Sequence, residues 1–164
     1  MTSKRKLLVV LHVLTSVSGV GAVLAELLVL AGAVSQTDPA GQDAALRFAE
    51  QVVYSVGIPL LTVGVVVGVL SALTSPWGLF KHTWVLKKLL LTLVNLAVPV
   101  LVVGPRVTEV ADGSLAAWLV FGGLGVQLLL FVLATVLSVY KPKGRVGAGN
   151  RPATRDRAPA LSHP

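Results

Sequence analysis

Residues 75–92, SPWGLFKHTWVLKKLLLT, join a proline-containing connection to a long apolar segment. Two adjacent lysines, Lys87 and Lys88, lie just inside this segment, next to the tryptophans Trp77 and Trp84. Lysine side chains near the end of a membrane-spanning helix can extend to the lipid headgroups, and tryptophan is enriched at the same interface. The stretch therefore predicts one end of a transmembrane helix.

The composition supports a membrane-embedded chain. Of its 164 residues, 54% are hydrophobic and 13% are charged, and the mean hydropathy is +0.82. Soluble domains carry about 25% charged residues and rarely contain apolar runs of about 18 residues or more. The net charge of +7 could indicate nucleic-acid binding, but the basic residues cluster beside apolar segments, where membrane topology explains them. We therefore expect the lipid bilayer, and no nucleic acid, as the environment of this chain.

Four apolar segments are each long enough to cross ~30 Å of hydrocarbon at 1.5 Å per residue. They cover about residues 7–34, 52–73, 84–103 and 115–140. Without water in the bilayer core, such segments must be helices to satisfy their backbone groups. We predict an all-α fold, with residues 1–140 forming a four-helix transmembrane bundle. Residues 141–164, rich in Gly, Pro, Arg and Ala, predict a disordered basic tail.

The distribution of lysine and arginine predicts the orientation. Basic residues cluster at 4–6, at 81–88 and from 141 onward, whereas the other two connections each contain one arginine, Arg47 or Arg106, beside acidic residues. By the positive-inside rule, both termini and the middle connection face the cytoplasm. The sequence thus predicts a multi-pass protein of the plasma membrane with both termini in the cytoplasm.

The N-terminal segment has a second interpretation. Its basic start, its apolar stretch and the sequence Ala31-Gly32-Ala33 imitate a signal peptide with a cleavage site. However, the apolar stretch is much longer than the ~7–15 residues of a signal peptide, and it contains Glu26. We therefore expect this segment to remain as the first span.

Ionisable groups inside membrane spans are the first candidates for a functional site, because burying them in hydrocarbon is costly. His12 and Lys88 lie at about the same depth near the cytoplasmic ends of their spans, and Thr135 returns to that depth in the fourth span. These three residues predict a small site that faces the cytoplasm. The alternative is a structural histidine bonded to a neighbour and a lysine that extends to the headgroups.

Other polar and small residues predict helix packing. The first span carries a stripe of small and polar residues, and the second contains a GxxxG motif at 64–68, so both faces are expected to point into the bundle. The stripe comprises His12, Thr15, Ser16, Gly19, Ala22, Val23 and Glu26. Asn95 and Gln127, both near the middle of the membrane, are expected to form an interhelical hydrogen bond.

Glu26 is placed near the opposite headgroups by its distance from the start of the first span. We expect it to have a structural role there, paired with Arg47 or Arg106.

Motifs for catalysis and for metal binding are absent from the sequence. It has no H-E-x-x-H, G-x-S-x-G or P-loop pattern, and it contains no cysteine. Of its three histidines, only His12 lies within a span. The sequence therefore predicts no metal site, no cofactor and no enzymatic activity.

Two stretches carry a family resemblance. TSPWGLFKHTWVLKKLLLT at 74–92 and LHVLTSVSGVGAVLAELLVLA at 11–31 resemble an actinobacterial family of uncharacterised four-span integral membrane proteins. That family has a TPWGLFRHYWVLVKLLLT-like block at the second connection and third span. The resemblance covers residues 7 to about 140 and implies the four-span fold. It implies no reaction, and the further histidine that members often have late in the third span is replaced here by the Asn95–Pro99 region.

The block shared with that family singles out a possible binding face. Lys88 follows Trp84 by four residues, so both lie on one side of the helix, and His82 lies just before them. Together with His12, these residues are our candidate ligand-binding set. The ligands considered are a lipid headgroup, a quinone-like molecule or an acidic segment of a partner protein.

Two functions follow as expectations. The first is a structural or accessory membrane component with a membrane-protein partner or a second copy of itself. The alternative is a small-molecule binding or transport protein, for a lipid, a quinone-like molecule or another cofactor, with its site near the cytoplasmic ends of the first and third spans.

Overall fold

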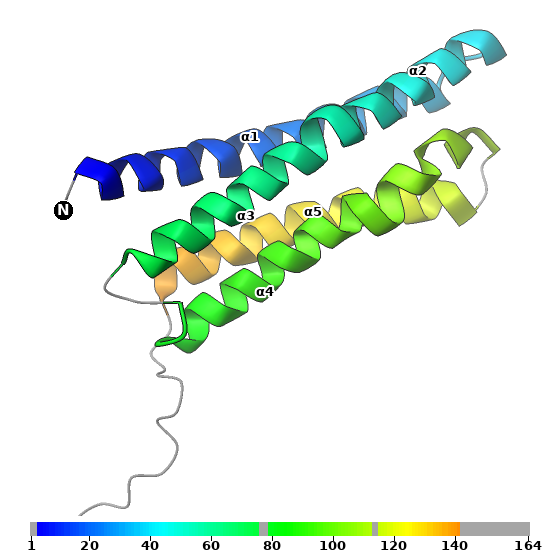
Figure 1. The fold of residues 1–164 in the computed structure, drawn as a ribbon. Coiled ribbons are helices and arrows are strands. Elements are labelled where there is room, and N and C mark those ends of the chain that lie inside the picture. The colour runs from blue at the N-terminus through cyan, green and yellow to red at the C-terminus, as the bar shows by residue number, and fades with distance from the viewer. Residues whose placement is uncertain (1–2, 76–78, 113–114, 142–164) are drawn as a thin grey trace, which may run out of the picture.

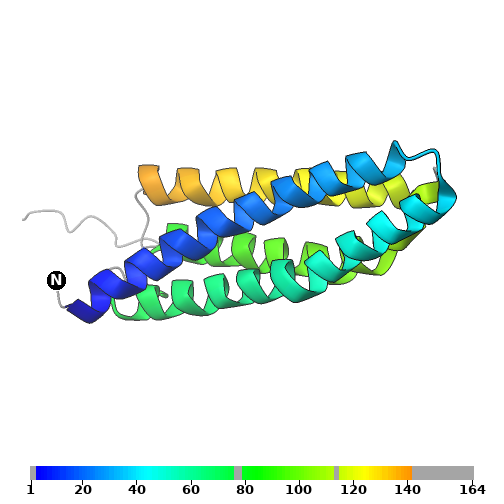
Figure 2. The same ribbon diagram turned by 90° about the horizontal axis from the view of Figure 1, so that it is seen from above.

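Four helical rods lie side by side in the computed structural model, which describes residues 3–75, 79–112 and 115–141 (Figures 1 and 2). The first rod is α1 (Ser3–Val34) and the fourth is α5 (Leu115–Tyr140). The second rod consists of α2 (Pro39–Val52), the π-helical turn η1 (Val53–Gly57) and α3 (Ile58–Leu73). The third consists of α4 (Thr83–Val98), the π-helical turn η2 (Pro99–Val103) and the 3₁₀ helix η3 (Gly104–Asp112). The predicted all-α fold is confirmed, whereas the predicted tail at 142–164 lies outside the described residues.

All four rods have the length and hydropathy of transmembrane helices. Large apolar side chains cover their outward faces; Leu28, Leu90, Leu101 and Val132 are each more than half exposed. Such a surface is unfavourable in water and suits contact with lipid chains. The chain is therefore built as a multi-pass membrane protein.

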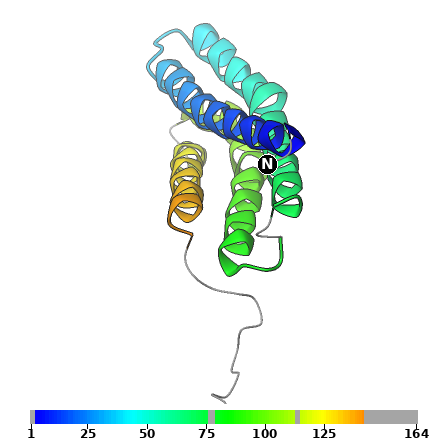
Figure 3. The same ribbon diagram turned by 90° about the vertical axis from the view of Figure 1, so that its left-hand side faces the viewer.

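The two ends of the bundle differ in charge. The start of α1, the connection that precedes α4 and the end of α5 lie together at one end (Figures 1 and 3). We call this the basic end, because it carries the described lysines and Arg5. The other, which we call the far end, holds the α1–α2 connection and η3. The first and last described residues, 3 and 141, both lie at the basic end, so the described chain crosses the bundle an even number of times.

The second and third rods extend further at the far end than the predicted spans. Asp38 caps α2 by accepting a hydrogen bond from the Gly41 backbone N–H at 2.9 Å, and Pro39 fits the first helical position. The added turns bury apolar side chains such as Leu46 and Val107. Residues 39–51 thus extend the second span beyond its predicted start at residue 52.

Both π-helical turns are associated with a proline. Pro59 follows η1 and Pro99 begins η2. Proline has no backbone N–H and crowds the preceding turn, so the hydrogen-bond pattern widens there. The Ile58 N–H accordingly donates to the Val53 carbonyl, five residues back. These turns change the direction in which the following side chains point, which hydropathy alone does not reveal.

The packed apolar core lies toward the far end. Its members come from all four rods and are nearly inaccessible: Val23, Leu30, Ala33, Leu46, Ala49, Val53, Val103, Val107, Val110, Val120 and Leu124. Toward the basic end the rods enclose cavities instead. The dense half therefore fixes the rods relative to one another, and the open half is available for a ligand.

Glycines allow close helix contacts in the open half. A Cβ atom at Gly68 on α3 would lie 3.0 Å from the His12 Cε1 atom on α1, and one at Gly64 would lie 3.6 Å from the Thr15 hydroxyl oxygen. The GxxxG motif therefore packs within the chain, against the small and polar stripe of α1, and both faces point into the bundle as predicted.

Gly123 on α5 provides a test of this packing. A Cβ atom there would lie 3.1 Å from the Val103 Cγ2 atom, whereas one at Gly125 would meet no atom within 4 Å. We expect Gly123→Leu to lower the apparent melting temperature in detergent by several degrees, because overpacking costs ~1–3 kcal/mol. Gly125→Leu, two residues away, should leave it unchanged. Equal effects of the two substitutions would contradict the packing described here.

Candidate functional site

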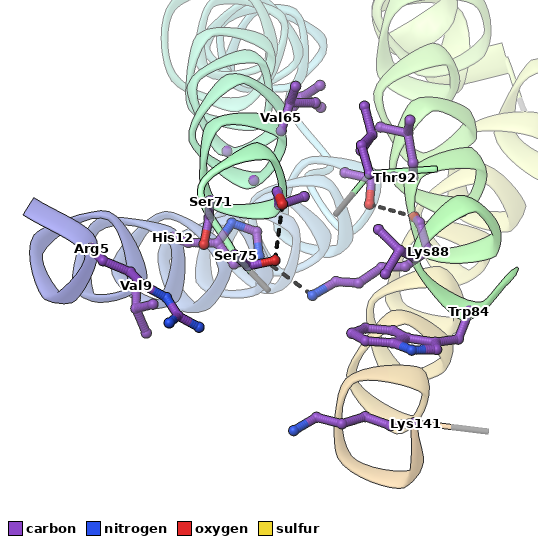
Figure 4. Close-up of a pocket in the computed structure, with 17 residues that line it drawn as sticks. Arg5, Val9, His12, Val65, Ser71, Ser75, Trp84, Lys88, Thr92 and Lys141 are labelled. Atoms are coloured by element: carbon purple, nitrogen blue, oxygen red, sulfur yellow. Dashed lines mark hydrogen bonds between the residues drawn. The ribbon is translucent and has the colours of Figure 1, made fainter. Parts of the chain in front are cut away.

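A cavity of about 250 Å³ lies between α1, α3 and α4 near the basic end (Figure 4). Most of its lining is apolar, including Val9, Val69 and Leu89. Its polar lining comes from Arg5, His12, Ser71, Ser75, Trp84, Lys88, Thr92 and Lys141. The cavity therefore combines an apolar wall with a group of polar side chains.

His12 and Lys88 meet at the inner side of this cavity. The Lys88 Nζ atom lies 3.5 Å from the His12 Nε2 atom, although the two residues are 76 positions apart in sequence. This distance is at the long limit for a hydrogen bond. The His12 Nδ1 atom is buried without a hydrogen-bond partner among the described residues. Both side chains thus keep hydrogen-bonding capacity for another molecule.

Packing fixes the position of the His12 imidazole. The ring lies against Gly68, where any larger residue would crowd it. The backbone carbonyl of His12 also accepts hydrogen bonds from the hydroxyl groups of Thr15 at 3.1 Å and Ser16 at 2.7 Å. The small residues of α1 and α3 therefore hold this histidine at the cavity.

The charged side chains at the cavity are all basic. Arg5, Lys88 and Lys141 line it together with His12, and no described acidic residue does. Lys87, adjacent to Lys88, is exposed and does not line the cavity. Positive charge beside low-dielectric walls attracts an anion.

Lys141 lines the cavity and has an unusual backbone conformation. It follows the last residue of α5 and has a φ angle of 42°, in the left-handed region. This conformation commonly ends helices, but it is unfavourable for a residue with a Cβ atom. The Lys141 side chain is part of the cavity lining.

The candidate residues taken from the sequence divide into two groups. His12, Trp84 and Lys88 line the one cavity, and the Trp84 indole is drawn between the Lys88 and Lys141 side chains in Figure 4. His82 is the N-cap residue of α4, its carbonyl accepts the Val85 N–H at 3.2 Å, and it is not part of the lining. Trp77, which the sequence places at the membrane interface, lies outside the described residues. The binding role of this set stays a prediction.

A second cavity, of about 70 Å³, lies on the other side of the His12–Lys88 contact. Its lining shares His12, Gly64, Lys88 and Thr92 with the first cavity and adds the side chains of Asn95, Thr135 and Ser138. The predicted grouping of His12, Lys88 and Thr135 is therefore present here. The Thr135 hydroxyl donates to the Phe131 carbonyl at 2.8 Å.

Asn95 and Gln127 are in contact between α4 and α5, as predicted. Both are almost fully buried, and the Gln127 Nε2 atom donates to the Asn95 backbone carbonyl at 3.4 Å. The bond uses the backbone rather than the Asn95 side chain. The Asn95 Oδ1 atom therefore has no hydrogen-bond partner among the described residues.

The expected position of Glu26 near the headgroups and its expected pairing with an arginine were wrong. Glu26 is only 6% exposed, and no described arginine pairs with it. Arg47 pairs with Asp43 at 2.8 Å, and Arg106 donates to the Leu101 and Val102 carbonyls. The bundle extends further at the far end than the predicted spans, so Glu26 lies inside it rather than at its surface.

Sequence reasoning missed part of the cavity lining. Arg5 and Val9 precede His12 by seven and three residues, so helical periodicity places them on the His12 face. Helical periodicity does not predict that Lys141 lines the cavity, because the position of this residue depends on how α5 ends.

The described residues contain no group of three or more His, Cys, Asp or Glu side chains that could hold a metal ion. No family model matches the chain, and neither a curated protein nor a solved structure matches it significantly. The resemblance to the actinobacterial family therefore stays a prediction.

Adjacent residues on α3 test whether the cavity contains water. Val69 lines it, whereas Leu70 is 44% exposed on the outward face. The chain has no cysteine, so single cysteines can be introduced without background. We expect Val69→Cys to react much faster than Leu70→Cys with a water-soluble maleimide, because the reactive thiolate forms in water and not in lipid. Equal rates would mean that the cavity is dry or closed.

Proposed function

We propose that the protein binds an amphiphile with an anionic headgroup, a carboxylate or a phosphate, in the cavity at the basic end. The observation that carries this proposal is the combination of basic side chains, no described acidic side chain and an apolar wall in one cavity. Such a lining complements a molecule that has one negative end and one hydrocarbon end. This function develops the small-molecule alternative drawn from the sequence.

The size of the cavity limits what it can hold. Ligand pockets usually have volumes of about 300–1,000 Å³. At about 250 Å³, this cavity suits a headgroup and the first part of an acyl chain. The remainder of the chain would lie among the surrounding lipids. The proposed ligand is therefore a single-chain amphiphile or one chain of a lipid.

The polar side chains have distinct roles in this proposal. Lys88 and His12 bind the headgroup, since their nitrogen atoms are close together and incompletely bonded. Arg5 and Lys141 add positive charge, and the Trp84 ring contributes apolar surface. None of these roles involves a change in covalent bonds, so the proposal is binding rather than catalysis.

The proposal also includes an orientation. Basic residues at one end of the bundle indicate that both ends of the chain face the cytoplasm, because positively charged segments stay on that side. The ligand would then come from the cytoplasmic leaflet of a bacterial plasma membrane. Its negative headgroup would lie at the level of the other cytoplasmic headgroups.

A second candidate function is the accessory role, with a membrane-protein partner or a second copy of the chain. The observation that favours it is that small residues of α1 face outward on both sides of the exposed Leu28. A Cβ atom at Gly21 or Gly32 would meet no atom within 4 Å, and Ala25 between them is exposed. Small residues on a lipid-facing surface allow another helix to approach closely.

The orientation can be measured by cysteine labelling. Ser3 lies at the basic end and Ser35 at the far end, and both are exposed. In intact cells we expect a membrane-impermeant maleimide to label Ser35→Cys. Ser3→Cys should react only after the membrane is opened. The reverse pattern would place the cavity in the opposite leaflet.

The ligand proposal can be tested by native mass spectrometry in mild detergent. We expect the protein to bind oleate or lysophosphatidate in preference to the uncharged monoolein. Lys88→Met and His12→Gln should each weaken this binding at least about tenfold, a change of ~1.4 kcal/mol. Lys87→Met removes the same charge outside the cavity and should have little effect.

Two results would contradict the ligand proposal: equal binding of monoolein, or equal effects of the Lys87 and Lys88 substitutions. A dimer mass that is lost in Gly21→Leu would support the accessory function instead.

A further inference from the structure

A third cavity lies deeper in the bundle, between the second cavity and the packed core. It is small, about 10 Å³, which is close to the space that one water molecule requires. Glu26 and Gln127 are its polar lining residues. Apart from Glu26, none of its described lining residues on α1, on the second and third rods or on α5 is titratable or charged.

Shared lining residues and one hydrogen bond link the three cavities along the bundle. His12 and Lys88 line both the first and the second. Asn95 lines the second, and its carbonyl accepts the hydrogen bond from Gln127, which lines the third. We call this series, from Lys88 through Asn95 and Gln127 to Glu26, the polar track.

Each of the three cavities is lined by a residue with a buried polar atom that lacks a partner among the described residues. Among the described residues, the buried side-chain atoms without a hydrogen bond are His12 Nδ1, Asn95 Oδ1 and Glu26 Oε1. All three residues line these cavities. A buried polar atom without a partner is costly, and water in a small polar cavity is the usual remedy. The track is therefore a place for internal water.

The track is closed toward the far end. Beyond Glu26, an apolar plug fills the bundle and consists of Leu30, Leu46, Val103, Val107, Val120 and Leu124, each 2% exposed or less. No described polar side chain lies in this plug. Cavities with polar linings thus lie between Glu26 and the basic end, whereas only apolar side chains of the plug lie between Glu26 and the far end.

From these observations we infer that Glu26 is a proton-binding site that exchanges protons with the basic end of the bundle through water in the polar track. Protons pass along the hydrogen bonds between waters and polar side chains to the Glu26 carboxylate. The proton enters from water at the basic end and returns by the same route, so no other reactant is consumed. This inference does not depend on which amphiphile occupies the first cavity.

The surroundings of Glu26 favour a proton over a metal cation. A carboxylate buried without a counter-charge is strongly unfavourable, so a positive species must accompany it. Hard cations need several oxygen ligands, and the side chains here supply only those of Glu26 and Gln127. The available volume also leaves no room for an ion with its own waters.

Both π-helical turns lie at this carboxyl group. Val53 and Gly57 of η1 and Pro99 of η2 line the Glu26 cavity. Single π-helical turns within α-helices occur frequently at functional sites. Their meeting at one buried carboxyl is a second feature that singles out this position.

Infrared spectroscopy of the protein in lipid vesicles can test the inference. We expect a carboxylic-acid C=O band that disappears in Glu26→Gln, responds to pH and shifts rapidly on transfer to heavy water. Asn95→Leu and Gln127→Leu interrupt the track, so each should slow that shift at least severalfold. Thr62→Val provides the control, because Thr62 is exposed on α3 and its hydroxyl bonds to its own helix.

Three results would overturn the inference. The first is the absence of a band that depends on Glu26 and responds to pH. The second is exchange that remains equally fast in both track variants, with melting curves showing that they are folded. The third is a Glu26 carboxylate signal that depends on sodium rather than on pH. Glu26→Gln should leave oleate binding unchanged, so this test and that of the ligand proposal can fail separately.

Discussion

The close contact between α1 and α3 is the constraint on which the candidate site depends. With only a hydrogen atom as its side chain, Gly68 leaves room for the His12 imidazole, and a Cβ atom would lie 3.0 Å from the ring. In this position His12 meets Lys88 of α4 and separates the first two cavities. A larger residue at 68 would move the ring and change both cavities together. A packing motif thus also determines the geometry of a polar site.

The two halves of the bundle differ in their packing. Tight apolar packing at the far end supplies the contacts that hold the rods together, with Leu30, Val107 and Leu124 fully buried. The other half contains the cavities and the polar side chains. Unpaired polar atoms are costly in hydrocarbon, so keeping them requires that the rest of the bundle be stable. The packing of the plug at the far end therefore stabilises the fold enough to allow the cavities and the unpaired polar atoms of the polar track.

The fold could be predicted from hydropathy and basic residues, because the lipid environment leaves few alternatives to long helices. The contact between His12 and Lys88 followed in part from their equal depth. Two features could not be predicted in this way. The lining contributed by Lys141 depends on the end of α5, and the depth of Glu26 depends on turns added at residues 39–51 and 104–112. The stripe on α1 did place Glu26 on the inner face; the error lay in the assumed length of the bundle.

The adjacent lysines at 87 and 88 show why charge counts alone do not identify a site. Both raise the positive charge of the same connection, so the topology rule treats them alike. A helix turns by about 100° per residue, and only Lys88 therefore faces the cavity while Lys87 is exposed. Topology accounts for having lysine at this depth, but it does not require that one of the two point inward beside His12. That inward position is what an anionic ligand would explain.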